Sequence, residues 1–340
     1  RSVASLKRIS KREFAHEYGD IISVENLLLA WQEFVCGKRK KHDVQEFSFR
    51  LMDNILAIHE DLAQQRYKHG GYYAFKISDP KPRQIHKASV RDRLVHHAIY
   101  RILYPRFDKL FIADSYSCRL GKGTHKALRR FKYFSNIASK NNTRTVWVLK
   151  CDIKKFFANI DHEILFSLLE KRIQDKNIID LLKNIVSSFS VKPSVGLPLG
   201  NLTSQLLVNI YMNEFDQFAK HTLKARHYLR YADDFVFLSD DRSWIESLIP
   251  RIQEFLTMRL RLTLHPDKLF IKTVASGVDF LGWVHFPDHR VLRTATKRRM
   301  FRGLRKTKGK NATIQSYLGL MSHGNTKKLQ SEIEKLQMES

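Results

Sequence analysis

Three aspartates stand where strand-like stretches of the sequence end. Asp152 closes the apolar, β-branched run "TVWVLKCDI", whereas Asp233 and Asp234 interrupt the apolar stretch "LRYADDFVFLS". Crowded carboxylates raise one another's free energy unless a cation neutralises them, and hard oxygen ligands of this kind suit Mg²⁺. Two such ions about 3.5–4 Å apart can activate a 3′-hydroxyl and stabilise a leaving pyrophosphate in an in-line displacement. We therefore predict that the two stretches are neighbouring strands and that these aspartates are metal ligands and catalytic residues.

Other acidic residues have simpler explanations. For an Asp-Asp pair alone, a solvated turn is the ordinary interpretation, and only the flanking apolar strands and Asp152 favour a metal site at 233–234. Asp161, with Glu163 two residues later, is best explained as the N-cap of the helix "HEILFSLL". Asp240 and Asp241 precede "RSWIESLI" and are predicted to be caps or solvated acids.

Basic residues near glycines or prolines are candidate phosphate contacts. The segment "KPRQ" puts Lys81 and Arg83 on a constrained turn, and "CRLGKGTHKAL" places Arg119 beside two glycines that let backbone N–H groups approach phosphate. Neither segment has the GxxxxGK[ST] order of a Walker A loop. Lys268, in "LHPDKLFIK", either donates a proton to pyrophosphate or holds a phosphate, with a solvated lysine as the alternative.

Positive charge dominates the composition. The 340 residues include 60 basic and 34 acidic ones, a formal net charge of +26, and 43% of them are hydrophobic. Such an excess repels itself unless a polyanion is the usual partner, so nucleic acid is the first candidate and an anionic membrane surface the second.

The densest basic run, from Arg293 to Lys310, has nine basic residues and no acid. Met300, Phe301 and Leu304 would give it one apolar helical face, leaving its basic side chains to contact the phosphates of a duplex. The predicted contacts there are Arg298, Arg299, Arg302 and Arg305.

Several classes of protein are excluded or disfavoured. Cys36, Cys118 and Cys151 are far apart and lack CxxC spacing, so neither a disulfide framework nor a zinc site is expected. No apolar run approaches the roughly 20 residues of a membrane span, and "RSVASLKRISKREF" lacks the apolar core of a secretory signal. A soluble cytoplasmic protein without a membrane partner fits best.

Helices and hairpins alternate without a regular βα repeat, which indicates an α+β fold. Residues 24–68 have mainly helical spacing, and "GYYAFKI" is strand-like. A helix is expected near 242–260 and a hairpin in "SGVDFLGWVHF", and a mostly helical pattern closes the chain.

Taken together, these residues resemble a reverse transcriptase. "YADD" (231–234) is similar to the family's [YF]xDD box, and "LKCDIKKFFANIDH" (149–162) resembles its first metal-aspartate motif. "DPKPRQI" and "SYSCRLGKGTHKAL" resemble the two fingers motifs that hold the incoming triphosphate and the template. "LTLHPDKLFI" and "GVDFLGW" resemble the later palm and primer-grip motifs. The resemblance runs in unbroken order from about residue 72 to residue 286.

This resemblance implies a right-hand polymerase fold. Residues 1–145 would form an N-terminal extension and fingers, 146–286 a palm with an antiparallel sheet and helices, and 287–340 a small basic helical thumb. The implied activity is RNA-directed DNA synthesis on an RNA template from a DNA primer with two Mg²⁺ ions, for which Mn²⁺ can substitute. Phe157, which the residues alone assign to core packing, lies at the offset of the side chain that excludes a ribose 2′-hydroxyl. The deoxynucleotide contacts would be Lys81, Arg83, Arg119, Phe157, Leu199 and Gly200, and the nucleic-acid contacts Gln205 and Tyr231 together with the four arginines of the basic run.

The segment "LGNLTSQ" (199–205) bears on the branch of the family. Most reverse transcriptases carry QGxxxSP there, whereas Leu199 replaces the glutamine and Gln205 the proline. The pattern resembles the [IVL]GxxxSQ form of prokaryotic diversity-generating retroelements, although Ala232 stands where that branch commonly has Met. Losing the glutamine removes a polar contact near the sugar and base, and the resemblance implies error-prone copying opposite template adenines.

Two other functions stay open. One is an anti-phage defence reverse transcriptase that makes cDNA from a small RNA, and the other is a basic RNA-binding protein that keeps the fold without catalysis. The diversity-generating branch further implies a structured cognate RNA and a small basic helical accessory protein as partners. We expect no ribonuclease H, endonuclease or maturase domain after the thumb-like tail.

Overall fold

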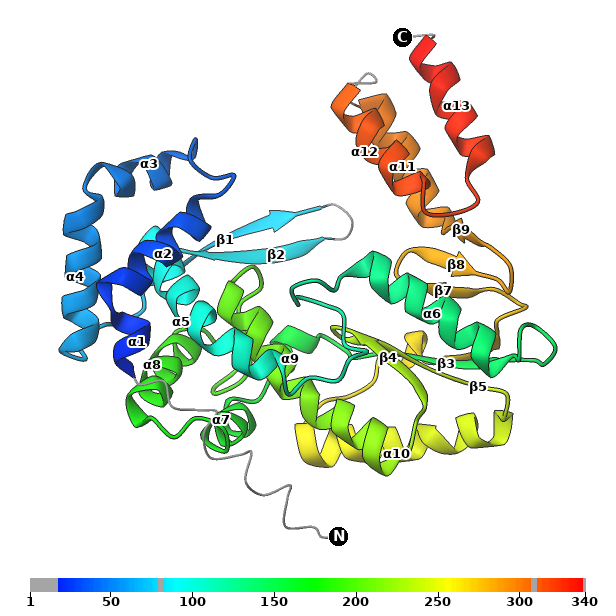
Figure 1. Cartoon of the computed structure of the whole chain (residues 1–340), viewed down its shortest axis with the longest axis horizontal. Helices are drawn as coiled ribbons and strands as arrows, with labels where there is room; N and C mark the ends of the chain where they lie inside the picture. Colours follow the sequence, from blue (N-terminus) through cyan, green and yellow to red (C-terminus); the bar gives the residue numbers. More distant parts are fainter. Residues whose placement is uncertain (1–17, 79–81, 307–310, 339–340) are drawn as a thin grey trace, which may run out of the picture. The chain divides into compact units, whose positions relative to one another are not determined.

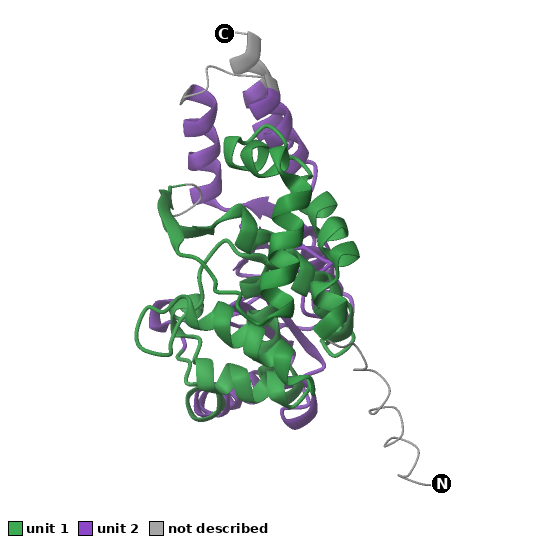
Figure 2. Cartoon of the chain, turned by 90° about the vertical axis from the view of Figure 1, so that its left-hand side faces the viewer, with its two compact units in different colours: residues 1–113, 154–218, 255–263 green, residues 114–153, 219–254, 264–340 purple. Residues whose placement is uncertain are grey.

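The computed structural model describes residues 18–78, 82–306 and 311–338, and Figure 1 shows its elements. These residues divide into two compact units, coloured in Figure 2, and the chain passes between them several times. The described residues of unit 1 lie within 1–113, 154–218 and 255–263. Those of unit 2 lie within 114–153, 219–254 and 264–340. The contiguous division into fingers, palm and thumb stays a prediction.

Unit 1 is mainly helical. Its helices are α1 (Tyr18–Ile22), α2 (Val24–Val35), α3 (His42–Phe49), α4 (Leu51–Ala63), α5 (Val90–Asp108), the short 3₁₀ helix η2 (Phe156–Asn159), α7 (His162–Glu170), α8 (Lys176–Ser187) and α9 (Leu202–Gln217). The Asp161 carboxylate accepts a hydrogen bond of 3.1 Å from the Ile164 amide and caps α7, as predicted.

Two antiparallel strands, β1 (Tyr72–Ile77) and β2 (Arg83–Ala88), form a hairpin in unit 1. Arg83 pairs with Ile77 at the start of β2. The prediction that Arg83 sits on a turn was therefore wrong, because the strand pairing begins at this residue. Lys81 lies outside the described residues.

A four-stranded antiparallel sheet organises unit 2. Its order is β4-β5-β3-β6, with bounds β3 (Trp147–Asp152), β4 (His227–Tyr231), β5 (Asp234–Ser239) and β6 (Phe270–Thr273). The central strand β3 is buried, as its apolar sequence predicts, with Val148, Leu149 and Cys151 at 0% exposure. The predicted hairpin between 229 and 239 is confirmed by the pairing of β4 with β5.

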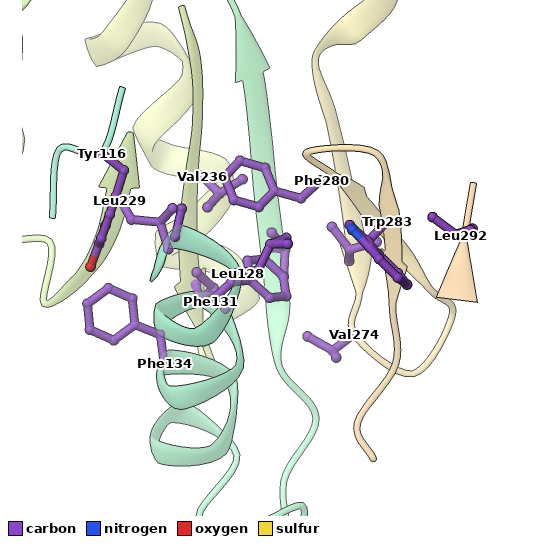
Figure 3. Packing of buried hydrophobic residues seen from close by; sticks show 14 of the residues in the cluster. Tyr116, Leu128, Phe131, Phe134, Leu229, Val236, Val274, Phe280, Trp283 and Leu292 are labelled. Carbon is purple, nitrogen blue, oxygen red and sulfur yellow. The ribbon is translucent and has the colours of Figure 1, made fainter. Parts of the chain in front are cut away.

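One face of this sheet packs on helix α6 (Thr124–Ala138). Leu128, Phe131 and Phe134 recur at helical spacing and are buried in a cluster that includes Leu229 of β4 and Val236 of β5. Figure 3 shows these side chains gathered between the helix and the strands. The strand ends are thereby fixed on a rigid, well-packed support.

The same hydrophobic cluster extends into the rest of unit 2. Further elements of unit 2 are η4 (Pro266–Lys268), β7 (Val278–Phe280), β8 (Trp283–His285), β9 (Arg290–Leu292), α11 (Thr294–Lys306), α12 (Asn311–Met321) and α13 (Lys327–Met338), and the short π-helix η3 (Phe218–Thr222) follows α9. The predicted hairpin around 278–285 is the β7–β8 pair, to which β9 adds a third strand. Met300 and Leu304 of α11 are buried and Phe301 is partly buried, so the predicted apolar face of the basic run is confirmed.

Helix α10 (Arg242–Leu260) carries the chain from unit 2 back to unit 1, close to the predicted bounds. Cys36, Cys118 and Cys151 are free cysteines. In the ranges that the structure describes, no helix has both the length and the apolar character needed to cross a membrane.

Candidate active site

The three predicted aspartates meet at one end of the unit 2 sheet. Asp152, the last residue of β3, pairs directly with Asp234, the first residue of β5. Directly opposite residues of antiparallel strands have Cβ atoms about 4.5–5.5 Å apart and share one face of the sheet. Asp233 occupies the preceding turn, where its carbonyl oxygen accepts a hydrogen bond of 3.1 Å from the Ile153 amide. The structure thus brings together carboxylates that are about eighty residues apart in the sequence.

A two-residue turn, Ala232–Asp233, joins the paired residues Tyr231 and Asp234. Ala232 has φ of +56°, in the left-handed region that costs a residue with a Cβ atom about 1–2 kcal/mol. Positive φ at the first central position matches the twist of hairpin strands. Strain at this position is consistent with a turn that is held by its surroundings.

Two lysines contact the aspartates. Lys268, in η4, places its Nζ atom 2.6 Å from Oδ1 of Asp152, and the Asp152 carbonyl accepts a hydrogen bond of 2.8 Å from the His265 amide. Lys150, two residues before Asp152 on the same face of β3, places Nζ 3.4 Å from Oδ2 of Asp234. The lysines partly neutralise a cluster that would otherwise be strongly negative.

The surroundings of Asp234 shift the pKa of its carboxyl strongly. The pKa of its carboxyl is raised to about 7, chiefly by burial; Lys150 opposes this rise, while Asp152 and Asp233 contribute to it. Such a carboxyl is stabilised in its charged form by an added cation. Asp152 and Asp233 thus both act electrostatically on Asp234.

The donor set fits a divalent cation. Within the described ranges, no three His, Cys, Asp or Glu side chains converge closely enough to hold a metal ion in this conformation. The Asp152 and Asp234 carboxylates face lysines instead. However, Oδ1 of Asp234 is buried and has no hydrogen-bond partner among the described residues. A buried, unpartnered oxygen beside two further carboxylates is a suitable ligand for Mg²⁺.

The loop before α6 lies beside this turn in unit 2. The Thr124 hydroxyl donates a 3.1 Å hydrogen bond to the Tyr231 hydroxyl, and Gly123 N donates to Tyr116 O at 3.0 Å. Arg119 is half-buried, and its Nη1 atom donates to Ser115 O at 3.0 Å. Of the predicted nucleotide contacts, Arg119 therefore belongs to the same unit as the aspartates.

The other predicted nucleotide contacts that the structure describes belong to unit 1. The Leu199 carbonyl accepts a 3.0 Å hydrogen bond from the His86 amide of β2. Gly200 has φ of +103°, and a Cβ atom there would lie 2.8 Å from Ile85 Cγ2, so this position requires glycine. Phe157 lies half-buried in η2, and its carbonyl accepts from Leu197 N at 2.8 Å.

The remaining candidates are exposed arginines or half-buried residues. Arg83 is exposed, and Gln205 is half-buried in the first turn of α9. Arg298, Arg302 and Arg305 are exposed on α11, whereas Arg299 is half-buried. Their roles in binding nucleotide or nucleic acid stay predictions.

Two residues close to the aspartates were missed from the sequence. Lys150 and Arg230 are basic residues inside apolar strands, with exposures of 9% and 0%. Buried cations of this kind are rare unless paired, so a lone basic residue within each apolar run was the available signal.

Comparisons with known proteins identify the family. A model described as "Reverse transcriptase (RNA-dependent DNA polymerase)" matches residues 75–285. The chain belongs to the reverse transcriptase family. Its motifs quoted above fall within or beside the matched range.

Among relatives of this chain, protein YkfC of Escherichia coli is 28% identical over 258 residues, covering 65% of this chain and 66% of YkfC. Group II intron-encoded protein LtrA of Lactococcus lactis is 24% identical over 298 residues, covering 67% of this chain and 47% of LtrA. The chain thus spans just under two thirds of YkfC and about half of LtrA. These relatives support the family and do not single out the diversity-generating branch.

Solved telomerase structures share the fold. The apo telomerase of Candida tropicalis matches with a TM-score of 0.51 and 12% identity, covering 64% of this chain and 47% of that one. Telomerase of Candida albicans, in complex with a TWJ fragment of telomeric RNA, matches with a TM-score of 0.50 and 13% identity, covering 68% and 46%. The predicted α+β polymerase fold is confirmed.

Proposed function

We propose that the chain is an RNA-directed DNA polymerase that uses an RNA template and a DNA primer. The observation that carries this proposal is the direct pairing of Asp152 with Asp234 across β3 and β5, with Asp233 in the adjoining turn. A polymerase of this family needs metal-binding carboxylates at a fixed strand end. A relative that had lost catalysis would have no chemical need for all three aspartates.

The proposed roles follow from the contacts of each side chain. Asp152, Asp233 and Asp234 would hold two Mg²⁺ ions, with Mn²⁺ as a substitute. When bound, the ions supply activation of the primer 3′-hydroxyl and neutralise charge on the departing pyrophosphate. Lys150 holds Asp234 from within the sheet. Because Lys268 contacts the Asp152 carboxylate, it would release that oxygen when a cation binds and turn its ammonium group toward the leaving phosphate.

Primer extension tests the proposal. The assay uses an RNA template, a DNA primer, deoxynucleotides and Mg²⁺, and compares the unmutated protein with Asp233→Asn. We expect a loss of at least about 100-fold, because several kcal/mol of transition-state stabilisation depend on the ions. The matched control is Asp240→Asn, which changes the first aspartate of the other Asp-Asp pair in the same unit.

The outcomes separate the alternatives. Equal incorporation by the unmutated protein and Asp233→Asn would remove the metal-ligand assignment. No incorporation by the unmutated protein, even with its cognate RNA, would favour an RNA-binding protein without catalysis.

We further propose that the enzyme is error-prone at template adenines, as in a diversity-generating retroelement. The supporting feature is Leu199 in "LGNLTSQ", where an apolar side chain cannot offer the polar contact of the usual glutamine. A structured cognate RNA and a small basic helical accessory protein are the partners proposed with this branch.

Sequencing the cDNA made from native RNA tests this assignment. Substitutions concentrated opposite adenines, and reduced by Leu199→Gln, would support diversification. A faithful product, or a short repeat copied from a small RNA, would instead support phage defence. An error spectrum that Leu199→Gln leaves unaltered would remove Leu199 as the cause.

A further inference from the structure

Arg230 precedes the YADD segment and is completely buried, with 0% of its surface exposed. A guanidinium group keeps its charge in the protein interior, so burial is costly unless its N–H groups are satisfied. Successive side chains of β4 point to opposite faces of the sheet, and Tyr231 pairs with Asp234, so these two side chains share one face. Arg230 therefore projects from the opposite face of the sheet to the Asp234 side chain.

The Arg230 side chain joins two segments. Its Nη1 atom donates a 3.0 Å hydrogen bond to the carbonyl oxygen of Ala232, inside the aspartate turn. Its Nη2 atom donates a 3.0 Å hydrogen bond to Oγ of Ser115, which is also fully buried. The two ends of one rigid, planar fork thus fix the turn against residue 115.

Backbone contacts make the same connection. Arg230 N donates to Asp114 O at 2.9 Å, and Tyr116 N donates to Arg230 O at 3.0 Å, so residues 114–116 add a short parallel pairing beyond β4. The carbonyl of Ser115 accepts from Arg119 Nη1. Ser115 therefore binds Arg230 through its hydroxyl and Arg119 through its backbone.

The contact with Ala232 acts on the strained residue of the turn. Its φ of +56° is unfavourable for alanine, and a charge-assisted hydrogen bond to its carbonyl fixes the orientation of the next peptide unit, which leads to Asp233. Arg230 therefore acts on the position of Asp233 through the backbone of the turn.

We propose that Arg230 is a positioning residue that fixes the Asp233 turn and couples it to the 114–123 segment carrying Arg119. Through this link the carboxylates and the Arg119 loop keep one relative geometry. The proposal deepens the polymerase assignment and rests on it only where Asp233 is taken as a metal ligand.

Amide hydrogen exchange in the metal-free protein is the first test. The Ile153 amide, bonded to Asp233 O, reports on the turn, and the Gly123 amide, bonded to Tyr116 O, reports on the loop. In Arg230→Met we expect exchange at both amides to rise about tenfold or more, because a charge-assisted hydrogen bond is lost at each end. Arg230→Lys keeps the charge but cannot reproduce the fork, and should show most of this effect.

Ser115→Ala removes one arm of the bridge and remains informative if Arg230→Met fails to fold. It should speed exchange mainly at Gly123, with a smaller change at Ile153. The matched control is Ser139→Ala, which removes another buried serine hydroxyl of unit 2, one whose hydrogen bonds to described residues lie within 136–142. It should leave both amides unchanged.

Mn²⁺ binding, measured by electron paramagnetic resonance without substrate, is the second readout. Arg230→Lys should raise the Mn²⁺ dissociation constant about tenfold, since small displacements of ligands weaken a site strongly. Ser139→Ala should not change it. Arg230 would be merely structural if its variants lowered thermal stability while exchange at Ile153 and Mn²⁺ binding matched Ser139→Ala.

In Arg230→Met or Arg230→Lys, faster exchange at only one of the two amides, Ile153 or Gly123, would overturn the proposed coupling between turn and loop. Neither readout needs catalysis, so failure of the polymerase assignment appears separately as an unmutated protein that exchanges and binds Mn²⁺ as expected yet incorporates no nucleotide.

Discussion

Strand β5 has an Asp-Asp pair at each end, and the two pairs have opposite surroundings. At its start, Asp234 has 19% of its side chain exposed, faces Lys150 and pairs with Asp152. Beyond its end, Asp240 has 41% of its side chain exposed and forms an ion pair of 2.8 Å with the half-exposed Arg144. Asp241 accepts a 2.9 Å hydrogen bond from Trp244 N at the start of α10.

The electrostatics differ accordingly. Burial raises the pKa of Asp234 to about 7, whereas a hydrogen bond from Arg144 lowers the pKa of Asp240 below its ordinary value. The same dipeptide thus forms an energetically costly cluster at one strand end and an ordinary capped helix start at the other. Whether an aspartate pair is a candidate catalytic site depends on what the neighbouring strands bring to it.

The largest expected difference concerns the basic partners. Lys150→Met should lower the free energy of unfolding by about 1–2 kcal/mol near pH 8, because the buried Asp234 carboxyl, without its cation, must take up a proton about one pH unit above its pKa of about 7. Arg144→Met, the matched change at the other end, should cost less than about 1 kcal/mol because both partners are largely solvated. Urea unfolding of the metal-free proteins measures both.

Protonation gives this prediction a second check. Near pH 6 the cost of Lys150→Met should shrink, since a protonated Asp234 no longer needs a cation. If Lys150→Met and Arg144→Met lowered the free energy of unfolding equally at both pH values, the two strand ends would not differ electrostatically.

Much of this contrast was accessible from the sequence. The apolar runs around 152 and 233–234 predicted paired strands, and the residues after 241 predicted a helix start, so both pairs were assigned to the correct local structures. Local pattern was sufficient because strand and helix signals are short-range.

The partners of the aspartates were not accessible in this way. Lys268 meets Asp152 only after η4 is folded, and Arg230 meets Ser115 across about 115 residues of chain. Arg83 was misplaced because the proline of "KPRQ" indicated a turn where strand pairing in fact begins. These contacts depend on register and tertiary packing, which spacing along one sequence does not specify.

The next prediction concerns Lys268, the second lysine at the carboxylate cluster, which contacts Asp152. Lys268→Met should lower the turnover number for primer extension by about 100-fold if its ammonium group protonates the leaving pyrophosphate. It should also tighten Mn²⁺ binding, because no ammonium group competes for Asp152 Oδ1. Lys272→Met, which changes an exposed lysine of β6, is the control and should change neither value. A fall in turnover with weaker Mn²⁺ binding would contradict a competing role.

The pH dependence of stability should have opposite signs at the two ends. The folded-state pKa of Asp234 lies above its ordinary value of 3.8, so its stabilising contribution is complete below that value and is lost as pH rises toward about 7. Asp234→Asn should therefore become more stable relative to the unmutated metal-free protein as pH rises, by at most about 1.4 kcal/mol per pH unit. Asp240 has a lowered pKa, so its contribution is present above 3.8 and is lost in acid.

Unfolding in urea between about pH 5 and pH 7 checks the sign for Asp234, and the same measurement below about pH 4 checks the sign for Asp240. Asp240→Asn should follow the unmutated protein closely across that interval, because its ion pair is solvated. A flat difference for Asp234→Asn would place its folded-state pKa near the ordinary value and remove the contrast between the pairs.

The smallest expected effect is at the helix start. Asp241→Ala removes the acceptor for Trp244 N and should cost about 1 kcal/mol of stability, whereas Asp241→Ser keeps an acceptor and should cost much less. Neither change should alter the turnover number for primer extension, because Asp241 lies at the far end of β5 from the carboxylate cluster. A marked loss of turnover in Asp241→Ala at unchanged stability would mean that the second aspartate pair also serves the reaction. The distinction between the two ends of the strand would then fail.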